Sequence, residues 1–345
     1  MSKILITRHV GTHAMSILQG SGYELIVNPQ DSEPSREWVL HQIADPQVGA
    51  ACIMHSQPSD KVDQEFIDAC NENLKCVSTF SVGYDHINVK AAHARGIKIG
   101  HTPGVLNDAV ADITVMLVLM TLRKVGYGIN LVKRGEWPQI PWAPFVLCGH
   151  SLGHPGLKIG FLGFGRIPQA AVDRLLAFTN KTEPPTIIYT SSRERENQAT
   201  IDANFTKRWG VDIKRVEKDI LASQADVLIV LCDLNPSTKD IVNKDFLAKM
   251  KPTSILVNVA RGPVVNSDDL HAALKSGQIF GAGLDVLTGE PNIKPDHPLL
   301  HLDNCIVLPH LGSGDFDTRN KMAELCVRNA IQSMKGEPLL AEVKG

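Results

Sequence analysis

The sequence predicts an α/β protein that contains two parallel β-sheets. Short apolar segments rich in β-branched residues alternate with amphipathic segments of helical length, which is the pattern of βαβ units. The alternation is interrupted once, by a long apolar helix and the Gly/Pro-rich connector CGHSLGHPG (148–156), and then starts again. Because a chain of 345 residues is longer than a typical single domain, this interruption indicates two domains.

The first alternation begins at the N-terminus. Its strand candidates are KILIT (3–7), YELIVN (23–28), GAACIM (49–54), LKCVSTF (74–80) and IKIGH (97–101). The segments between them, such as SREWVLHQIAD and VDQEFIDACNEN, are polar and amphipathic, as expected of helices that cover a sheet. This half of the chain therefore predicts a parallel sheet with helical crossovers.

A long apolar helix is predicted after the chain break at TPG (102–104), with Asn107 or Asp108 as its cap. It includes ITVMLVLMTL (113–122), which is too short to cross a bilayer. A helix that is apolar on several faces needs burial on several sides. We therefore expect it to lie between the two domains or against a second subunit.

The second alternation contains six strand candidates. They are LKIGFLG (157–163), TIIYT (186–190), DVLIVL (226–231), SILVNV (254–259), GAGLDV (281–286) and CIVLPH (305–310). Helix-length segments separate them, which predicts a doubly wound parallel sheet. From about Phe316 the chain forms one amphipathic helix and a polar tail, which we expect to return to the first domain.

Composition restricts the classes of function. A formal net charge of -2 and the lack of a basic stripe argue against a nucleic-acid partner. The seven cysteines include no CxxC pair and no His/Cys cluster, so no metal site is predicted and the thiols are expected to be reduced. The N-terminal MSKILITRHV enters a strand pattern at once, without a signal peptide. We expect a cytoplasmic protein that does not enter membranes.

The segment KIGFLGFGRIPQAAV carries a dinucleotide-binding pattern. An apolar strand runs into Gly163, Phe164 and Gly165, and a helix opens at Arg166 and Ile167. In this motif the first glycine makes a tight turn, the second lets the backbone approach a pyrophosphate, and the helix N-terminus favours the anion. At the sixth position Pro168 replaces the usual glycine, and a first helical turn tolerates proline.

The end of the next strand, TIIYTSSRERE, indicates which dinucleotide binds. An NAD site usually has an acidic residue here, whereas arginine accommodates the 2′-phosphate of NADP. This strand ends in Ser191, Ser192 and Arg193, a set of hydroxyls and a guanidinium that suits a phosphate dianion. The alternative is a solvated turn with incidental charges. We therefore expect NADPH as the cofactor, with NADH as the weaker one.

Polar residues end three further strands of the second sheet. Arg261 follows SILVNVA, Asp285 and Glu290 follow GAGL, and His310 follows CIVLP. In an open α/β sheet, ligands bind outside the carboxyl ends of the strands, so these side chains are expected to converge. Each residue alone is more typical of a structural position, but the four together indicate a catalytic site.

At these residues the sequence resembles the D-isomer-specific 2-hydroxyacid dehydrogenases, and most closely their glyoxylate/hydroxypyruvate reductase branch. The resemblance spans nearly the whole chain. It is carried by SVGYDHINV (81–89), TPGVLNDAVADITVMLVL, GFLGFGRIP, NVARGPVVN, the stretch from AGLDV to GEP (282–291), HPLL (297–300) and LPHLGS. It implies a homodimer of two Rossmann/flavodoxin-like domains. The dinucleotide-binding domain, residues 106–315, would be inserted into a substrate domain formed by residues 1–105 and 316–345.

The resemblance assigns roles to the strand-end residues. His310 would be the acid–base group and Glu290 its carboxylate partner, which favours protonated imidazole. Arg261 would hold the carboxylate of a 2-oxo acid and polarise its carbonyl, where negative charge develops during reduction. The backbone N–H groups of Val82 and Gly83 would bind the same carboxylate.

The remaining assignments concern the cofactor and the shape of the pocket. Asp285 would face the nicotinamide ring, and Ser313, after the catalytic histidine, would contact the substrate. Trp142 lies in WPQIPWAPFVLCG (137–149), which resembles a loop that enters the neighbouring subunit's site and narrows it for short substrates. An interface tryptophan without catalytic effect is the alternative. Val259, Ala260, Gly312 and His310 complete the implied cofactor-binding set.

Two alternative functions remain open. One is a dehydrogenase of another 2-hydroxy acid, including phosphoglycerate, although the chain has no appended regulatory domain. The other is a dinucleotide-sensing binding protein similar to a corepressor of the same fold. A sensor would not need arginine, glutamate and histidine together, so their joint presence favours the reductase.

Overall fold

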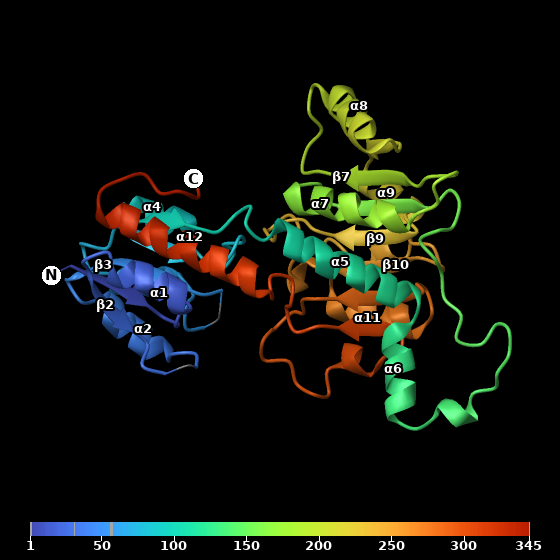
Figure 1. Cartoon of the computed structure of the whole chain (residues 1–345), viewed down its shortest axis with the longest axis horizontal. Helices are drawn as coiled ribbons and strands as arrows, with labels where there is room; N and C mark the ends of the chain where they lie inside the picture. The colour runs from blue at the N-terminus through green and yellow to red at the C-terminus, as the bar shows by residue number, and fades with distance from the viewer. Residues whose placement is uncertain (1, 31, 56–57, 345) are drawn as a thin grey trace. The chain divides into compact units, whose positions relative to one another are not determined.

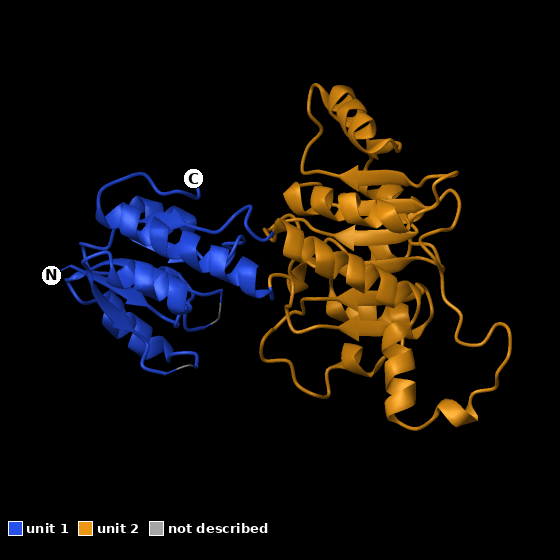
Figure 2. Ribbon diagram, in the orientation of Figure 1, with its two compact units in different colours: residues 1–106, 314–345 blue, residues 107–313 orange. Residues whose placement is uncertain are grey.

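The computed structural model describes residues 2–30, 32–55 and 58–344, which form two compact units (Figure 2). The first unit contains residues 1–106 and 314–345, and the second contains residues 107–313. The second unit is therefore an insertion in the first. Its boundaries lie within one or two residues of the predicted division at 106 and 315.

The first unit is built on a five-stranded parallel sheet with the order β2-β1-β3-β4-β5 (Figure 1). Its strands are β1 (Lys3–Ile6), β2 (Glu24–Val27), β3 (Val48–Ile53), β4 (Cys76–Thr79) and β5 (Lys98–Gly100). Each falls on one of the predicted segments. The central strand β3 is buried along its whole length, which explains why its sequence is apolar without alternation.

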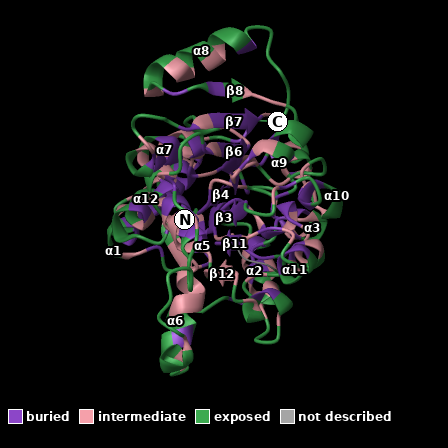
Figure 3. Cartoon of the chain, turned by 90° about the vertical axis from the view of Figure 1, so that its right-hand side faces the viewer, coloured by how far each residue is buried: buried purple, intermediate pink, exposed green. Residues whose placement is uncertain are grey.

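Helices cover both faces of this sheet. They are α1 (Thr12–Gln19), α2 (Arg36–Ile43), α3 (Gln64–Ala69), α4 (Val89–Ala94) and α12 (Phe316–Met334). Helices α1 and α12 lie on one face, and α2 and α3 on the other (Figure 3). The C-terminal tail also belongs to this unit, because the N–H of Val343 donates to the carbonyl of Ile99 at 2.8 Å and its side chain is buried in the core.

The second unit contains a seven-stranded parallel sheet with the order β12-β11-β10-β9-β6-β7-β8. Its strands are β6 (Lys158–Leu162), β7 (Thr186–Thr190), β8 (Ile213–Arg215), β9 (Val227–Val230), β10 (Ile255–Asn258), β11 (Gly281–Leu284) and β12 (Cys305–Val307). The six predicted strands are present, but β8 is additional. This edge strand contains only one apolar residue, Ile213, so it has no hydrophobic run that would reveal it.

Most helices of the second unit cover the two faces of its sheet. They are α5 (Asn107–Leu122), α6 (Val125–Lys133), α7 (Arg166–Leu175), α8 (Gln198–Trp209), α9 (Lys218–Gln224), α10 (Lys244–Leu247) and α11 (Ser267–Lys275). Helices α5 and α7 pack on one face and α9 to α11 on the other (Figure 3). The predicted long apolar helix ends at Leu122, because Lys124 adopts a left-handed φ of 54° before α6 begins.

The parallel direction of all seven strands determines where a ligand can bind. Their carboxyl ends lie along one edge, and neighbouring strands are about 4.8 Å apart. The predicted cofactor motif follows β6, and the predicted catalytic residues follow β10, β11 and β12. The sheet therefore collects both sets at one edge. Among the described residues, no helix is both long and apolar enough to span a membrane.

Candidate functional site

The turn after β6 is shaped by Gly163. This residue has a φ of 92°, and a Cβ placed on it would lie 2.8 Å from the carbonyl oxygen of Leu231 and 2.9 Å from the Cα of Cys232. Its N–H donates to the carbonyl of Thr190 on the neighbouring strand at 3.1 Å. Both the left-handed conformation and the close approach of backbone require glycine here.

Helix α7 starts directly behind this turn. Its N-cap is Gly165, and the described side chains supply no cap to this end of the helix. The first-turn N–H groups of Arg166 and Ile167 have no carbonyl of their own helix to bind, and Pro168 has no N–H. A Cβ on Gly165 would meet no atom within 4 Å, so the space in front of the helix is open. These features fit the pyrophosphate of a dinucleotide.

The side chain of Phe164 has a structural role that the motif did not indicate. Its ring stacks on Tyr189 of β7 at a centroid distance of 4.3 Å and meets Phe205 of α8 edge-on at 5.2 Å. Trp209 extends the same aromatic cluster. The ring therefore joins β6, β7 and α8, and the backbone of Phe164 is the part expected to face a cofactor.

The residues after β7 form a polar turn that contains Ser191, Ser192 and Arg193. The Ser191 hydroxyl donates to the carbonyl of Arg193 at 2.9 Å, and the side chains of Ser192 and Arg193 are exposed. Arg215, at the end of β8, donates from Nε to the Ser191 hydroxyl at 3.3 Å. A second guanidinium therefore reaches this turn, and the sequence did not indicate it because β8 has no hydrophobic run.

Two glutamates hold Arg215 in place. Its Nη1 lies 2.8 Å from a carboxylate oxygen of Glu217 and 3.7 Å from one of Glu194. The arginine side chain is 12% exposed, whereas those of Glu217 and Glu194 are 74% and 68% exposed. The guanidinium is therefore largely buried, and its two acidic partners are exposed surface side chains.

The turn after β10 presents Arg261. The side-chain amide of Asn258 donates to the Arg261 carbonyl at 3.0 Å, and its oxygen accepts the N–H of Ala260 at 3.0 Å. Arg261 Nη1 donates to the Ala260 carbonyl at 2.8 Å. Val259 and Ala260 are buried, so this turn is rigid and brings a partly exposed guanidinium to the sheet edge.

Gly262 joins the Arg261 turn to the loop after β11. A Cβ on Gly262 would lie 2.1 Å from the carbonyl carbon of Leu287 and 2.3 Å from the nitrogen of Thr288. The Leu287 N–H in turn donates to Oε2 of Glu290 at 3.1 Å. The backbone contact at Gly262 therefore ties the position of Arg261 to that of Glu290.

His310 and Glu290 form a direct pair. His310 Nδ1 lies 2.9 Å from Oε1 of Glu290, and the two side chains are 42% and 25% exposed. The other carboxylate oxygen accepts the Leu287 N–H, so both oxygens of Glu290 have a hydrogen-bond partner. With Nδ1 on the carboxylate, Nε2 is on the opposite side of the ring. This is the arrangement expected of an oriented acid–base group.

Asp285 builds the turn that carries His310. Its carboxylate oxygens accept the N–H groups of Leu311 at 2.7 Å and Gly312 at 2.8 Å, and its carbonyl accepts the His310 N–H at 2.9 Å. The side chain is buried, and burial raises the pKa of Asp285 although the two amides and His310 oppose the rise. Its predicted contact with nicotinamide stays a prediction.

Two small residues complete the turn. A Cβ on Gly312 would lie 3.0 Å from Oδ2 of Asp285, so glycine allows the carboxylate to approach the backbone. Ser313 is buried directly behind it. The second unit therefore brings Arg261, Glu290, Asp285 and His310 to three adjacent strand ends.

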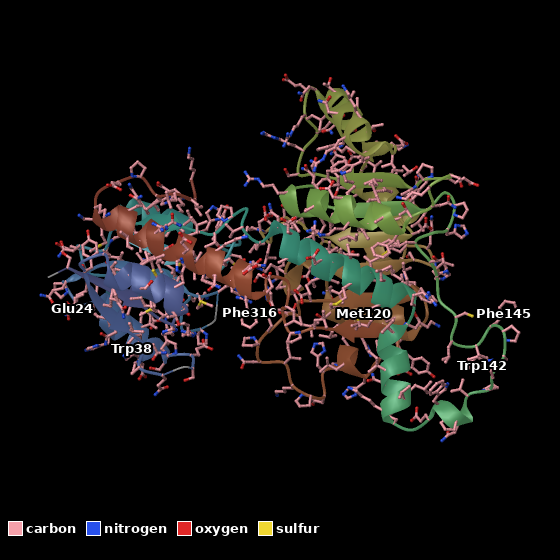
Figure 4. All side chains as sticks on the ribbon, in the orientation of Figure 1. Glu24, Trp38, Met120, Trp142, Phe145 and Phe316 are labelled. Carbon is pink, nitrogen blue, oxygen red and sulfur yellow. The ribbon has the colours of Figure 1, made fainter. Side chains whose placement is uncertain are left out.

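Other predicted residues come from other segments of the chain. Val82 and Gly83 belong to the first unit, in the loop after β4. Trp142 lies in the segment 137–149, which we call the arm, and 96% of its surface is exposed (Figure 4). Phe145 in the same segment is 91% exposed.

Comparison with known proteins agrees with this geometry. Residues 115–312 match the family model described as D-isomer specific 2-hydroxyacid dehydrogenase, NAD binding domain. The glyoxylate reductase/hydroxypyruvate reductase of Homo sapiens is 38% identical over 345 residues, covering 100% of this chain and 98% of that protein. The Mus musculus protein of the same name is 42% identical over 286 residues, covering 83% of this chain and 82% of that protein.

Solved structures give the same result for the fold. An NADPH-dependent glyoxylate/hydroxypyruvate reductase from Sinorhizobium meliloti, in complex with NADP and malonate, aligns with a TM-score of 0.80 and 30% identity over 99% of this chain and 96% of that one. A glyoxylate reductase from Paecilomyes thermophila aligns with a TM-score of 0.82 and 30% identity over 99% and 98%. With the glycine turn, the helix N-terminus and the His310–Glu290 pair at one sheet edge, this chain belongs to the D-isomer-specific 2-hydroxyacid dehydrogenases, a family of oxidoreductases.

Proposed function

We propose that this protein is an NADPH-dependent reductase that converts small 2-oxo acids, with glyoxylate and hydroxypyruvate as its substrates, to D-2-hydroxy acids. The observation that carries the proposal is the His310–Glu290 pair at 2.9 Å, beside the strand end that presents Arg261. The names of the human and mouse relatives support the choice of substrates. The second unit would hold the dinucleotide and the first unit the carboxylate-binding loop.

The residues divide the chemistry of reduction among them. When bound, a reduced nicotinamide dinucleotide supplies the hydride. Arg261 binds the substrate carboxylate and polarises the adjacent carbonyl, so that its positive charge stabilises the alkoxide that develops. His310 donates a proton to that oxygen, and Glu290 orients the ring and stabilises its cationic form.

The preference for NADPH rests on the turn after β7. Arg193 and Ser192 are exposed there, and Arg215 adds a packed guanidinium through Ser191. Arginine binds a phosphate dianion through two parallel donors, which a ribose hydroxyl does not match. The related structure that contains NADP supports the same choice.

We also propose that the protein is a cytoplasmic homodimer. The arm exposes Trp142 and Phe145, and the neighbouring helix α6 exposes Ile129 and Val132. A mostly apolar hollow of about 580 Å³ lies along α6, lined in part by Tyr127, Ile129 and Val132 and by Leu147 of the arm. An exposed apolar surface of this kind is typical of an interface. All seven cysteines are free thiols, which suits a reducing compartment.

A direct spectrophotometric assay tests the proposed reaction. The purified protein is mixed with NADPH and glyoxylate, hydroxypyruvate or a longer 2-oxo acid, and the absorbance of reduced nicotinamide is followed. We expect rapid oxidation with the two short acids and a loss of about a hundredfold or more in His310→Asn, which still binds NADPH. Tight NADPH binding without oxidation by the wild type would favour the dinucleotide-sensing alternative, and faster turnover of a longer acid would favour another dehydrogenase.

A further inference from the structure

The loop after β4 in the first unit has three consecutive carbonyl groups that are each held by a hydrogen bond. The Ser81 carbonyl accepts the N–H of Thr102 at 2.8 Å. The Val82 carbonyl accepts from Nδ1 of His101 at 3.0 Å. The Gly83 carbonyl accepts from the Ser81 hydroxyl at 2.6 Å. Residues 101 and 102, directly after β5, therefore anchor the beginning of this loop.

The first two of these bonds determine where the N–H groups of Val82 and Gly83 point. A trans peptide is planar, and its carbonyl and N–H point in opposite directions. Because Thr102 holds the Ser81 carbonyl, the N–H of Val82 points away from residues 101 and 102. Because His101 holds the Val82 carbonyl, the N–H of Gly83 also points away from them. Within the described part of the chain, neither of these two N–H groups donates a hydrogen bond.

His101 is itself firmly placed. Its N–H donates to the carbonyl of Ala341 at 3.2 Å, and its carbonyl accepts from the side-chain amide of Asn329, a buried residue of α12, at 3.1 Å. Its ring meets Tyr84 edge-on at a centroid distance of 5.8 Å. Because a carbonyl oxygen can only accept, Nδ1 of His101 must carry the proton in this contact.

We propose that His101 is a positioning residue for substrate binding. By donating Nδ1–H to the Val82 carbonyl, it fixes the peptide between Val82 and Gly83 so that the Gly83 N–H is preorganised for the substrate carboxylate. This inference rests on the proposed function, in which the loop binds that carboxylate. Preorganised donors bind an anion more tightly because no loop ordering is needed on binding.

Two substitutions separate the hydrogen bond from the volume of the ring. His101→Phe keeps an aromatic ring but removes the donor, whereas the side-chain amide of His101→Asn has a donor at the position of Nδ1. We expect His101→Phe to raise the KM for glyoxylate about tenfold, since one hydrogen bond is lost. The KM for NADPH and the value of kcat should change less than about twofold, and His101→Asn should restore most of the affinity.

A second measurement uses oxalate, a carboxylate that cannot be reduced, titrated calorimetrically into the full chain with NADP. His101→Phe should weaken oxalate binding about tenfold and His101→Asn should restore it. His13→Leu, a change of an exposed histidine in the same unit, is the control and should have no effect. If His101→Phe does not fold, His101→Leu, which also lacks the donor to the Val82 carbonyl, should weaken oxalate binding in the same direction.

The outcomes distinguish this inference from the proposed function. If the wild type binds oxalate but does not reduce glyoxylate, the proposed function fails while the oxalate titrations still test the loop. If the wild type is active and His101→Phe has an unchanged KM and oxalate affinity, the inference about His101 is wrong. An equal loss in His101→Phe and His101→Asn, or a wild type that binds no oxalate, also overturns it.

Discussion

His310 has a backbone conformation that few residues other than glycine adopt. Its φ of 55° lies in the left-handed region, where a side chain with a Cβ is strained by about 1–2 kcal/mol. Asp285 stabilises this conformation. Its carboxylate accepts the N–H groups of Leu311 and Gly312, and its backbone carbonyl accepts the N–H of His310. A strained residue held by a buried acid is typical of a functional site, since the surrounding structure must impose the geometry.

The charge of Glu290 should matter more for turnover than for binding. In Glu290→Gln an amide oxygen can still accept from His310, but the negative charge that stabilises imidazolium is gone. We expect kcat for glyoxylate to fall about a hundredfold with little change in the KM for NADPH. Steady-state kinetics with each substrate varied will measure both. Full kcat in this variant would show that the carboxylate is dispensable.

Cofactor preference should depend on two arginines. Arg193→Ala and Arg215→Ala should each lower kcat/KM for NADPH about tenfold or more, with little change for NADH, because each removes a charge-assisted partner of the 2′-phosphate. The ratio of kcat/KM for the two cofactors is the readout. Arg208→Ala, a change of an exposed arginine on α8, is the matched control. An equal loss for both cofactors would contradict the assignment of this turn.

At the scale of elements, two glycines illustrate two different roles. Gly262 lies where a Cβ would be 2.1 Å from the backbone of Leu287, whereas Gly165 lies where a Cβ would meet nothing within 4 Å. The first glycine allows the turns after β10 and β11 to touch, and the second leaves room at the N-terminus of α7. One is required by packing and the other by the expected ligand.

Alanine at these two glycines should therefore give opposite results. Gly262→Ala should lower stability by about 1–3 kcal/mol through overpacking and should also lower kcat, since the Arg261 and Glu290 loops must separate. Gly165→Ala should leave the melting temperature unchanged but raise the KM for NADPH about tenfold or more. Thermal melts and kinetics on the same preparations will compare them. A stable, active Gly262→Ala would contradict the predicted clash.

The N-terminus of α12 provides a prediction about pH. The N–H of Thr318 donates to Asp315 at 2.8 Å, and hydrogen bonds from the Thr318 side chain and backbone lower the pKa of Asp315 below its ordinary value of 3.8. A lowered folded-state pKa means that the carboxylate stabilises the fold at neutral pH. This contribution is lost as the pH falls through the folded-state pKa.

Asp315→Ala should therefore be less stable than the wild type by about 1 kcal/mol at neutral pH. The difference should begin to shrink near pH 3.8 and level off below the lowered pKa of the folded state, where the neutral carboxyl group still accepts a hydrogen bond but carries no charge. Denaturant unfolding of both proteins over a series of pH values will show this. Asp315→Asn, which caps without a charge, should give a smaller difference that follows pH in the same way, because both variants lack the titrating carboxylate. A difference that is constant with pH would exclude a charged cap.

At the scale of the whole molecule, the arm is the feature that a single chain does not explain. Trp142 and Phe145 are almost fully exposed, which is unfavourable for large apolar side chains in water (Figure 4). The second unit folds around its sheet without them. A second copy of the chain, as in the proposed homodimer, would cover them.

Polar substitutions in the arm should therefore change the oligomeric state. We expect Trp142→Ser combined with Phe145→Ser to convert the dimer to monomers at micromolar concentration, as measured by size-exclusion chromatography with light scattering. Phe316→Ser is the matched control, because Phe316 is also 91% exposed but lies in α12, outside the arm. A wild-type protein that is monomeric in the same experiment would overturn the homodimer.

The sequence alone determined all the strands of the two sheets except β8, and it showed which polar residues interrupt apolar segments. Apolar strands such as β3 and β9 are buried along their length, so their composition reports their environment directly. The glycines after β6 and the polar residues after β10, β11 and β12 were visible for the same reason, since each interrupts an apolar pattern. The local pattern of apolar residues was sufficient to identify these strands and strand ends, because it reflects which residues are buried.

The tertiary structure alone decided which of these residues touch. The contact of Gly262 with Leu287, the clamp of Asp285 on the His310 turn and the hydrogen bond of His101 to Val82 join residues that are distant in the chain and follow no period. Strand β8 and its Arg215 were invisible because a three-residue edge strand is defined by its pairing with β7. Strand order and backbone contact are properties of the assembled sheet, and no local pattern encodes them.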